Sequence, residues 1–131
     1  MNAASKHQAH ALKLFEAFEN GTPDAIENAL GSFAPEAKFY MWGPHKPPMA
    51  GVEEMRNGFG EMFKQLEDFR YRIVNVAEHG DILFIERVEW FTFKKEHKVE
   101  VNLVSVSKLG TDNKLISWTD YFDSAVLTGL E

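Results

Sequence analysis

Apolar residues in the first half of the chain recur at intervals of three and four, which is the period of a helix with one buried face. Asn20-Gly21 supplies a stop after the first such stretch, and Thr22-Pro23 supplies an N-cap and a first-turn proline for the next. The pattern predicts three helices, over residues 6–20, 22–30 and 52–66.

The segment between the second and third helices is predicted to be largely irregular. Pro35 should break the chain, and residues 38–42 should form only a short strand. Three prolines within residues 44–48 predict a stiff loop, because each proline fixes its own φ and lacks a backbone donor.

The second half changes to a period of two, which is typical of β-strands. The alternation predicts four strands, over residues 69–77, 82–93, 99–109 and 115–122. Helices followed by consecutive antiparallel strands indicate a single α+β domain over residues 1–131. We expect three N-terminal helices to pack on the concave face of one strongly curved, mainly antiparallel sheet. Such a cone leaves an apolar pocket suited to a small ligand.

Composition and charge narrow the class of partner. Hydrophobic residues make up 44% of the chain, which is enough for one packed core. The formal charge of −6 argues against nucleic acid or a membrane as partner, because phosphate groups need a basic face. The absence of cysteine excludes disulfides and thiolate chemistry. With no signal-like apolar run and no membrane-length apolar window, we expect a soluble, cytoplasmic protein.

The last predicted strand carries a carboxylate on its apolar face. Asp120 alternates in phase with Ile116, Trp118 and Phe122, so all four side chains point the same way. Burying a charge is costly unless the charge is paired or neutralised. Asp120 therefore needs a partner, either for chemistry or simply to anchor a structural hydrogen bond.

The long strand over residues 82–93 offers that partner. Arg87 and Glu89 share one face with four apolar residues, but both faces are mostly apolar, so periodicity does not choose the inner one. If this face looks inward, Arg87 stands between Glu89 and Asp120, and its five donors can hold both carboxylates. Opening a strained ring ether with water requires a base and an acid, and two carboxylates with separated pKa values supply both. The alternative is a buried network that satisfies only itself.

These residues carry a resemblance to a known family. Glu86-Arg87-Val88-Glu89, together with the Trp118-Thr119-Asp120-Tyr121-Phe122-Asp123 run, resembles the limonene-1,2-epoxide hydrolase family of the NTF2-like and SnoaL-like superfamily. The likeness extends over residues 8–123. The resemblance implies that Asp120 is the base that activates water, Arg87 the bridging arginine and Glu89 the acid.

Two departures from the family pattern concern the acid and the water. Glu89 replaces an aspartate and is longer by one C–C bond, about 1.5 Å. The family orients its water with a tyrosine and an asparagine on the first strand, and Tyr40 matches the tyrosine. Trp42 or Gly43 stands where the asparagine belongs, and Asn102 on a neighbouring strand is a candidate replacement.

Large apolar residues are candidates for the pocket wall, although core packing is their ordinary role. We expect a small lipophilic ligand or substrate to contact Trp42, Met55, Phe59, Phe63, Phe91 and Trp118, with Asn102 as a polar contact. The histidines have no partners at metal-binding spacing, so neither a metal nor a cofactor is expected. Apolar residues on the opposite face of the long strand, Phe84, Val88 and Trp90, suggest a homodimer.

Three functions are compatible with these features. The first is an epoxide hydrolase-like enzyme that adds water to a small lipophilic epoxide in one step. The second is a SnoaL-like cyclase or a ketosteroid-isomerase-like enzyme that uses one carboxylate on an enolisable ketone, although residues 38–42 lack the aspartate expected of a standard isomerase. The third is a binding module that kept the scaffold and lost the chemistry.

Overall fold

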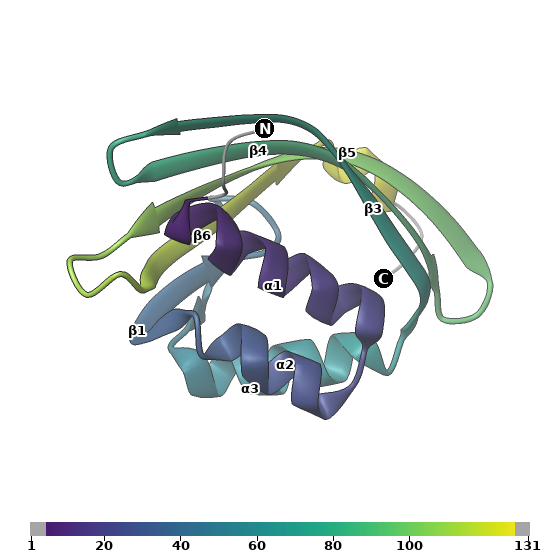
Figure 1. The fold of residues 1–131 in the computed structure, drawn as a ribbon. Helices are drawn as coiled ribbons and strands as arrows, with labels where there is room; N and C mark the ends of the chain where they lie inside the picture. Colours follow the sequence, from purple (N-terminus) through teal and green to yellow (C-terminus); the bar gives the residue numbers. More distant parts are fainter. Residues whose placement is uncertain (1–4, 128–131) are drawn as a thin grey trace.

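The fold is a curved sheet that arches over the helices, described for residues 5–127 by a computed structural model (Figure 1). The helices are α1 (Lys6–Asn20), α2 (Pro23–Leu30) and α3 (Val52–Phe63), followed near the end by the short 3-10 helix η1 (Ser124–Leu127). The strands are β1 (Phe33–Tyr40), β2 (Met49–Ala50), β3 (Leu66–His79), β4 (Ile82–Phe93), β5 (His97–Leu109) and β6 (Leu115–Phe122). The predicted α+β class, with three helices on one curved sheet, is confirmed.

All six strands belong to one sheet in the order β2-β1-β6-β5-β4-β3. β1 runs parallel to β6, and every other neighbouring pair is antiparallel. In Figure 1, α1 lies under the concave face, with α2 and α3 beyond it. Two register irregularities in β3, between Glu67 and Arg70 and between Ile73 and Asn75, bend the edge of the sheet, since bulges increase local twist.

The helix boundaries follow from local chemistry. The Ser5 hydroxyl accepts a hydrogen bond from the Gln8 N–H at the start of α1, and Gly21 ends the helix with a left-handed φ of 68°. Thr22 caps α2 through the Ala25 N–H, as its position before proline predicts. α3 ends at Phe63, three residues earlier than the pattern indicated, because Leu66 already belongs to β3.

The first strand differs most from its prediction. β1 begins at Phe33 rather than at residue 38 and ends at Tyr40, so Trp42 lies outside it. Pro35, expected to break the chain, lies within the strand, where the register with β6 is irregular between Phe33 and Lys38. A proline is tolerated at such a position because the ladder bond it cannot donate is already missing there. β2 and η1 were not predicted.

An aromatic core joins the helices to β1 and β6. Phe39 stacks on Trp118 with ring centroids 5.7 Å apart, and Phe59 of α3 meets Phe39 edge-on at 5.2 Å. Phe15 of α1 packs against Trp118 at 5.8 Å. These contacts hold α1 and α3 against the strand that carries Asp120, and so position the site.

Candidate active site

Three adjacent strands bring the charged residues together on the concave face. In the sheet register Ile85 of β4 pairs with Ser105 of β5, and Ser105 pairs with Asp120 of β6. Arg87 and Glu89 are buried, whereas Glu86, which points the other way, is exposed. The inner face of β4 is therefore the one that carries Arg87 and Glu89.

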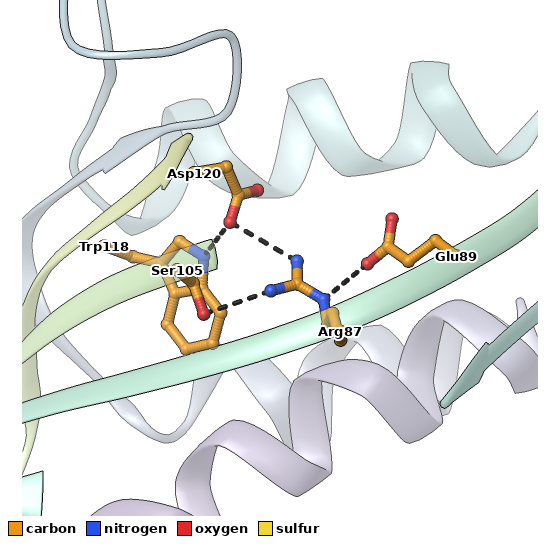
Figure 2. Close-up of polar contacts among 5 residues, drawn as sticks. All are labelled: Arg87, Glu89, Ser105, Trp118 and Asp120. Carbon is orange, nitrogen blue, oxygen red and sulfur yellow. Dashed lines mark hydrogen bonds and ion pairs between the residues drawn. The ribbon is translucent and has the colours of Figure 1, made fainter. Parts of the chain in front are cut away.

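Arg87 holds both carboxylates at once (Figure 2). Its Nε donates to Glu89 Oε2 at 2.7 Å, and its Nη2 donates to Asp120 Oδ1 at 3.3 Å. Its Nη1 donates to the Ser105 hydroxyl at 3.0 Å. The indole Nε1 of Trp118 donates to the same Asp120 Oδ1 at 2.9 Å. The arginine is 2% exposed. Its guanidinium carbon Cζ lies 4.5 Å from the centroid of the Phe15 ring, whose face attracts a cation.

Each carboxylate keeps one oxygen free. The bonds to Asp120 converge on Oδ1, and the bond to Glu89 uses Oε2, so Oδ2 and Oε1 have no partner among the described residues. Neither oxygen is fully buried, so both retain surface that solvent or a ligand can reach. In Figure 2 both free oxygens project away from the Arg87 main chain. The network thus presents two unsatisfied oxygen atoms to the space in front of it.

Burial raises the pKa of both carboxyls, and the Arg87 charge opposes this rise without cancelling it. The two groups differ in their surroundings. The Asp120 charge raises the pKa of Glu89 further, whereas the Trp118 hydrogen bond favours the ionised form of Asp120. Both carboxyls therefore hold a proton more readily than they would in water, and the ionised form of Asp120 is favoured by a second hydrogen bond, from Trp118.

A cavity of about 510 Å³ opens in front of the network. Most of its wall is aromatic or aliphatic, and Arg87, Glu89 and Asp120 all contribute to it. The other lining residues are Phe18, Met41, Trp42, Lys46, Met62, Leu66, Phe69, Phe91, Phe93, Lys94, Val101, Leu103, Phe122 and Ser124. A cavity of this size and character suits a small lipophilic molecule with a polar function at one end.

Only two of the apolar residues expected to contact a ligand line the cavity, Trp42 and Phe91. Met55 and Phe59 are 0% and 1% exposed and pack in the core, because their side of α3 faces β1 and α1 rather than the opening. Phe63 packs against Phe18 at 5.2 Å and is not part of the wall. Trp118 lies behind Asp120 and acts on the site through its hydrogen bond.

The two residues expected to orient a water molecule point away from the cavity. Tyr40 pairs with Thr119 in the sheet, on the face opposite Phe39 and Asp120. Asn102 is exposed and pairs with Val88, also on the outer face. Alternation along a strand explains both corrections, since neighbours of inward-facing residues must face outward.

Sequence reasoning did not single out the Ser105 hydroxyl, the third hydrogen-bond partner of Arg87. Its signal was a serine in phase with Val101 and Leu103, at the point where an apolar strand face becomes polar. In the sheet this serine lies directly opposite Asp120. Lys46 and Lys94 were also missed, because each lies in a charged or proline-rich turn that reads as solvated surface.

Residues 5–127 contain no group of three histidine and acidic side chains arranged to hold a metal ion. In the same part of the chain, no helix is both long and apolar enough to cross a membrane.

Comparison with known proteins adds the family context. A family model described as a SnoaL-like domain matches residues 11–118. No curated protein matches the chain. Among solved structures, an NTF2-like protein of unknown function from Burkholderia pseudomallei is similar with a TM-score of 0.81 and 16% identity, over 97% of this chain and 98% of that one.

Two further structures are similar at the same level of identity. A putative SnoaL-like polyketide cyclase from Jannaschia sp. CCS1 has a TM-score of 0.77 at 16% identity, covering 99% of this chain and 97% of that one. An LEH-like epoxide hydrolase from M. tuberculosis has a TM-score of 0.76 at 16% identity, covering 95% and 89%. At this identity the likeness establishes a shared NTF2-like fold, which hosts more than one chemistry.

Proposed function

Because the chain belongs to the SnoaL-like domain family, within the NTF2-like superfamily, we propose that its buried arginine–carboxylate network is the active site of a cofactor-independent enzyme that hydrolyses a small lipophilic epoxide in one step. One observation carries the proposal. Arg87 bridges Glu89 and Asp120, and each carboxylate keeps a free oxygen at an apolar cavity. The similar fold of the M. tuberculosis epoxide hydrolase supports it.

The proposed reaction uses the two free oxygens in opposite senses. Asp120 Oδ2 takes a proton from a water molecule as the water oxygen bonds to one ring carbon. The bond between that carbon and the ring oxygen breaks, and the ring oxygen receives the proton of Glu89. The product is a diol, and proton exchange with solvent returns Asp120 to its ionised form and Glu89 to its protonated form.

The electrostatics of the pair suit this division of roles. Asp120 accepts two hydrogen bonds on Oδ1, which stabilise its charge, while that charge helps to keep the proton on Glu89. The longer side chain of Glu89 is accommodated by its 2.7 Å bond to Arg87 Nε, and it still reaches the cavity wall. Arg87 fixes the spacing between base and acid, which a reaction of this kind requires.

The direct test is diol formation from a panel of cyclic and terpene epoxides. Asp120→Asn and Glu89→Gln should each lower kcat/KM by about 10²- to 10⁴-fold, the usual contribution of a general base or acid. Glu86→Gln is the matched control, because Glu86 lies on the same strand, faces outward and bonds to Asn75. It should leave turnover unchanged.

Two further measurements sharpen the test. In a single turnover in ¹⁸O-labelled water, a one-step reaction puts the label in the first diol formed, whereas a covalent carboxylate ester would release unlabelled diol.

The pH profile of kcat/KM should be bell-shaped, falling at low pH as Asp120 takes up a proton and at high pH as Glu89 loses one. Because burial raises both pKa values, both limbs should lie above the ordinary carboxyl range. Absence of turnover on every epoxide would refute the assignment.

A second candidate follows from the outward positions of Tyr40 and Asn102. In the part of the chain that the structure describes, the polar residues that line the cavity are Arg87, Glu89, Asp120, two lysines and Ser124, and none of these supplies a phenol or an amide to orient a water molecule. A proton transfer needs no such water: Asp120 would remove the α-proton of an enolisable ketone, and Glu89 would hydrogen-bond the enolate oxygen. The similar fold of the putative SnoaL-like polyketide cyclase is compatible with this chemistry.

Deuterium exchange separates the two reactions. An isomerase-like or cyclase-like enzyme should exchange the α-protons of a bulky cyclic ketone in D₂O, followed by NMR, and should leave epoxides intact. Asp120→Asn should abolish the exchange. Ligand binding without turnover of either substrate, unchanged in Asp120→Asn, would indicate a non-catalytic binding module instead.

We also propose that the outer face of the sheet forms a homodimer. Phe84 and Tyr121 are 42% and 46% exposed there, with Trp90 on the same face. Phe84→Glu should shift sedimentation equilibrium toward the monomer. Val76→Glu is the control, because Val76 is 43% exposed but pairs with buried Ile85 on the concave side. A monomeric wild type, or equal effects of the two variants, would contradict the proposal.

A further inference from the structure

The polar residues that line the cavity are sorted by depth. Arg87, Glu89 and Asp120 are each at most 8% exposed, so they lie at the inner end. The lining residues that are exposed, and therefore lie at the mouth, are Trp42, Lys46, Lys94 and Ser124. Among the described residues, the mouth thus carries two positive charges, and the carboxylates that line the cavity lie at its buried end.

These two lysines are distinguished by their position, because they bring positive charge to the cavity of a chain whose formal charge is −6. Among the described residues, the lysines that pair with a carboxylate are Lys64 and Lys108, whereas Lys46 and Lys94 pair with none. The two approach the mouth from different elements. Lys46 lies in the proline-rich loop between β1 and β2, and Lys94 lies in the turn between β4 and β5.

The backbone places Lys94 in an unfavourable conformation. Its φ of 52° is in the left-handed region, where asparagine or glycine is usual. The Lys94 N–H donates to the Gln65 carbonyl at 2.8 Å, which ties the turn to the start of β3. The ammonium lies 5.2 Å from the centre of the Phe93 ring, another residue of the cavity wall. The turn therefore carries its lysine against the cavity rather than away from it.

We propose that Lys46 and Lys94 form an anion-binding site at the mouth, and that the ligand of this cavity is an amphipathic carboxylic acid. The carboxylate stays at the mouth, where both lysines line the cavity. The apolar body lies among the aromatic wall, where Phe69 and Phe91 stack at 6.3 Å. The end remote from the carboxylate meets the Arg87 network. The inference deepens the proposed function, because it names the class of molecule that carries the reacting group.

The opposite orientation of the ligand is disfavoured by the charges at the inner end. Arg87 already holds two carboxylates at 2.7 and 3.3 Å. An incoming carboxylate there would face the free oxygens of Glu89 and Asp120, and it would also lose its hydration in a largely apolar cavity. At the mouth, by contrast, an anion keeps part of its water and gains two lysines that pair with no carboxylate of residues 5–127.

The test compares three ten-carbon probes of the same length, namely decanoate, decan-1-ol and decylammonium. The two ionic probes are kept below their micelle concentrations and the alcohol below its solubility limit. Binding is followed by tryptophan fluorescence, since Trp42 lies at the mouth and is 52% exposed. Wild-type protein should bind decanoate most tightly and decylammonium most weakly. The preference for decanoate should shrink at about 0.5 M salt, because exposed charges are screened.

The variants are Lys46→Gln, Lys94→Gln and the double variant. Each single change should weaken decanoate about 3-fold and the double change about 10-fold, the scale of partly exposed ion pairs, with decan-1-ol unaffected. Lys95→Gln is the matched control, because Lys95 is the next residue of the same turn, also has a left-handed φ (66°), and does not line the cavity. It removes the same charge and should leave decanoate binding unchanged.

The inference would be overturned by equal affinity for decanoate and decan-1-ol, or by a loss of decanoate affinity in Lys95→Gln as large as that in Lys94→Gln. It would also be overturned if decanoate binding survived the double change, because the anion would then lie at Arg87. Binding of none of the probes would also overturn it.

These readouts do not depend on turnover. Selective decanoate binding without epoxide hydrolysis would refute the proposed function alone. Equal kcat/KM for an epoxy acid and the matching epoxy alcohol would refute the inference alone.

Discussion

Replacing Arg87 with methionine should leave the two buried carboxyl groups of the site, Glu89 and Asp120, without a cation. The guanidinium is 2% exposed and donates to Glu89, Asp120 and Ser105. Methionine keeps most of the aliphatic volume, so the change chiefly removes charge and donors rather than opening a large cavity. Removing one partner of a buried ion pair costs about 3–5 kcal/mol of the free energy of unfolding.

Proton uptake sets a ceiling on that cost. A carboxyl with an ordinary pKa near 4 can be neutralised at pH 7 for about 4 kcal/mol, and at pH 5 for only about 1.4 kcal/mol. In the variant, Glu89 and Asp120 lose the cation that opposes the rise of their pKa values. Their folded-state pKa values therefore lie still further above the unfolded values, and stability must fall as the pH rises through that interval. The destabilisation should be about 3–5 kcal/mol at pH 7 and less than half of this at pH 5.

Urea unfolding followed by circular dichroism at the two pH values measures both numbers. Other groups titrate equally in wild type and variant, so the difference between the proteins isolates the network. Arg56→Met is the matched control, because Arg56 pairs with Glu27 at 2.6 Å on the surface and should show a small effect without contrast between pH 5 and pH 7. Adding Glu89→Gln and Asp120→Asn to the Arg87 variant should recover most of the loss. An Arg87→Met destabilisation that is the same at both pH values would refute the reasoning.

Two further predictions concern stability. His7 and His10 are buried, and within the described chain the Nδ1 atom of each has no hydrogen-bond partner. Burial lowers the pKa of both side chains. The free energy of unfolding should therefore be constant with respect to these groups above pH 6.5 and should decrease below it, because the unfolded chain binds the protons more tightly. A His7→Gln/His10→Gln variant should lose this acid component of the urea midpoint, and an unchanged pH dependence would contradict it. Gly60→Ala should stabilise α3 by about 1 kcal/mol in urea unfolding, since nothing lies near a Cβ there, whereas Gly58→Ala would press on the Met49 sulfur and should gain less. Equal gains would show that Met49 yields freely.

Much of the fold follows from local pattern. Each of the three helices and the four long strands was predicted from period, caps and turn residues, with boundary errors of a few residues. The first strand was the exception, because its start at Phe33 includes a proline that local rules treat as a break. Only the irregular pairing with β6 explains why Pro35 is tolerated there.

The candidate site divides in the same way. An aspartate in phase with Trp118 and Phe122 had to be buried and had to find a partner, whatever the fold. Which face of β4 looks inward was open, and on β1 Tyr40 was expected at the site. The pattern could decide neither, because period two sets the relative phase of neighbours and leaves the absolute phase free. The parallel pairing of Phe39 with Trp118 decided it, and it turned Tyr40 outward.

Contacts between distant segments were beyond the pattern altogether. A helical stripe indicates burial but does not identify the neighbouring residues, so the pattern did not exclude Met55 and Phe59 from a pocket wall, and the structure places them in the core. Lys46 and Lys94 belong to turns that lie nearly fifty residues apart, and nothing in either turn points to the other. The sequence determined which side chains must leave water and which helices and strands they form. The tertiary structure decided which of them meet, because sheet register and the curvature of the sheet over the helices are properties of the whole chain.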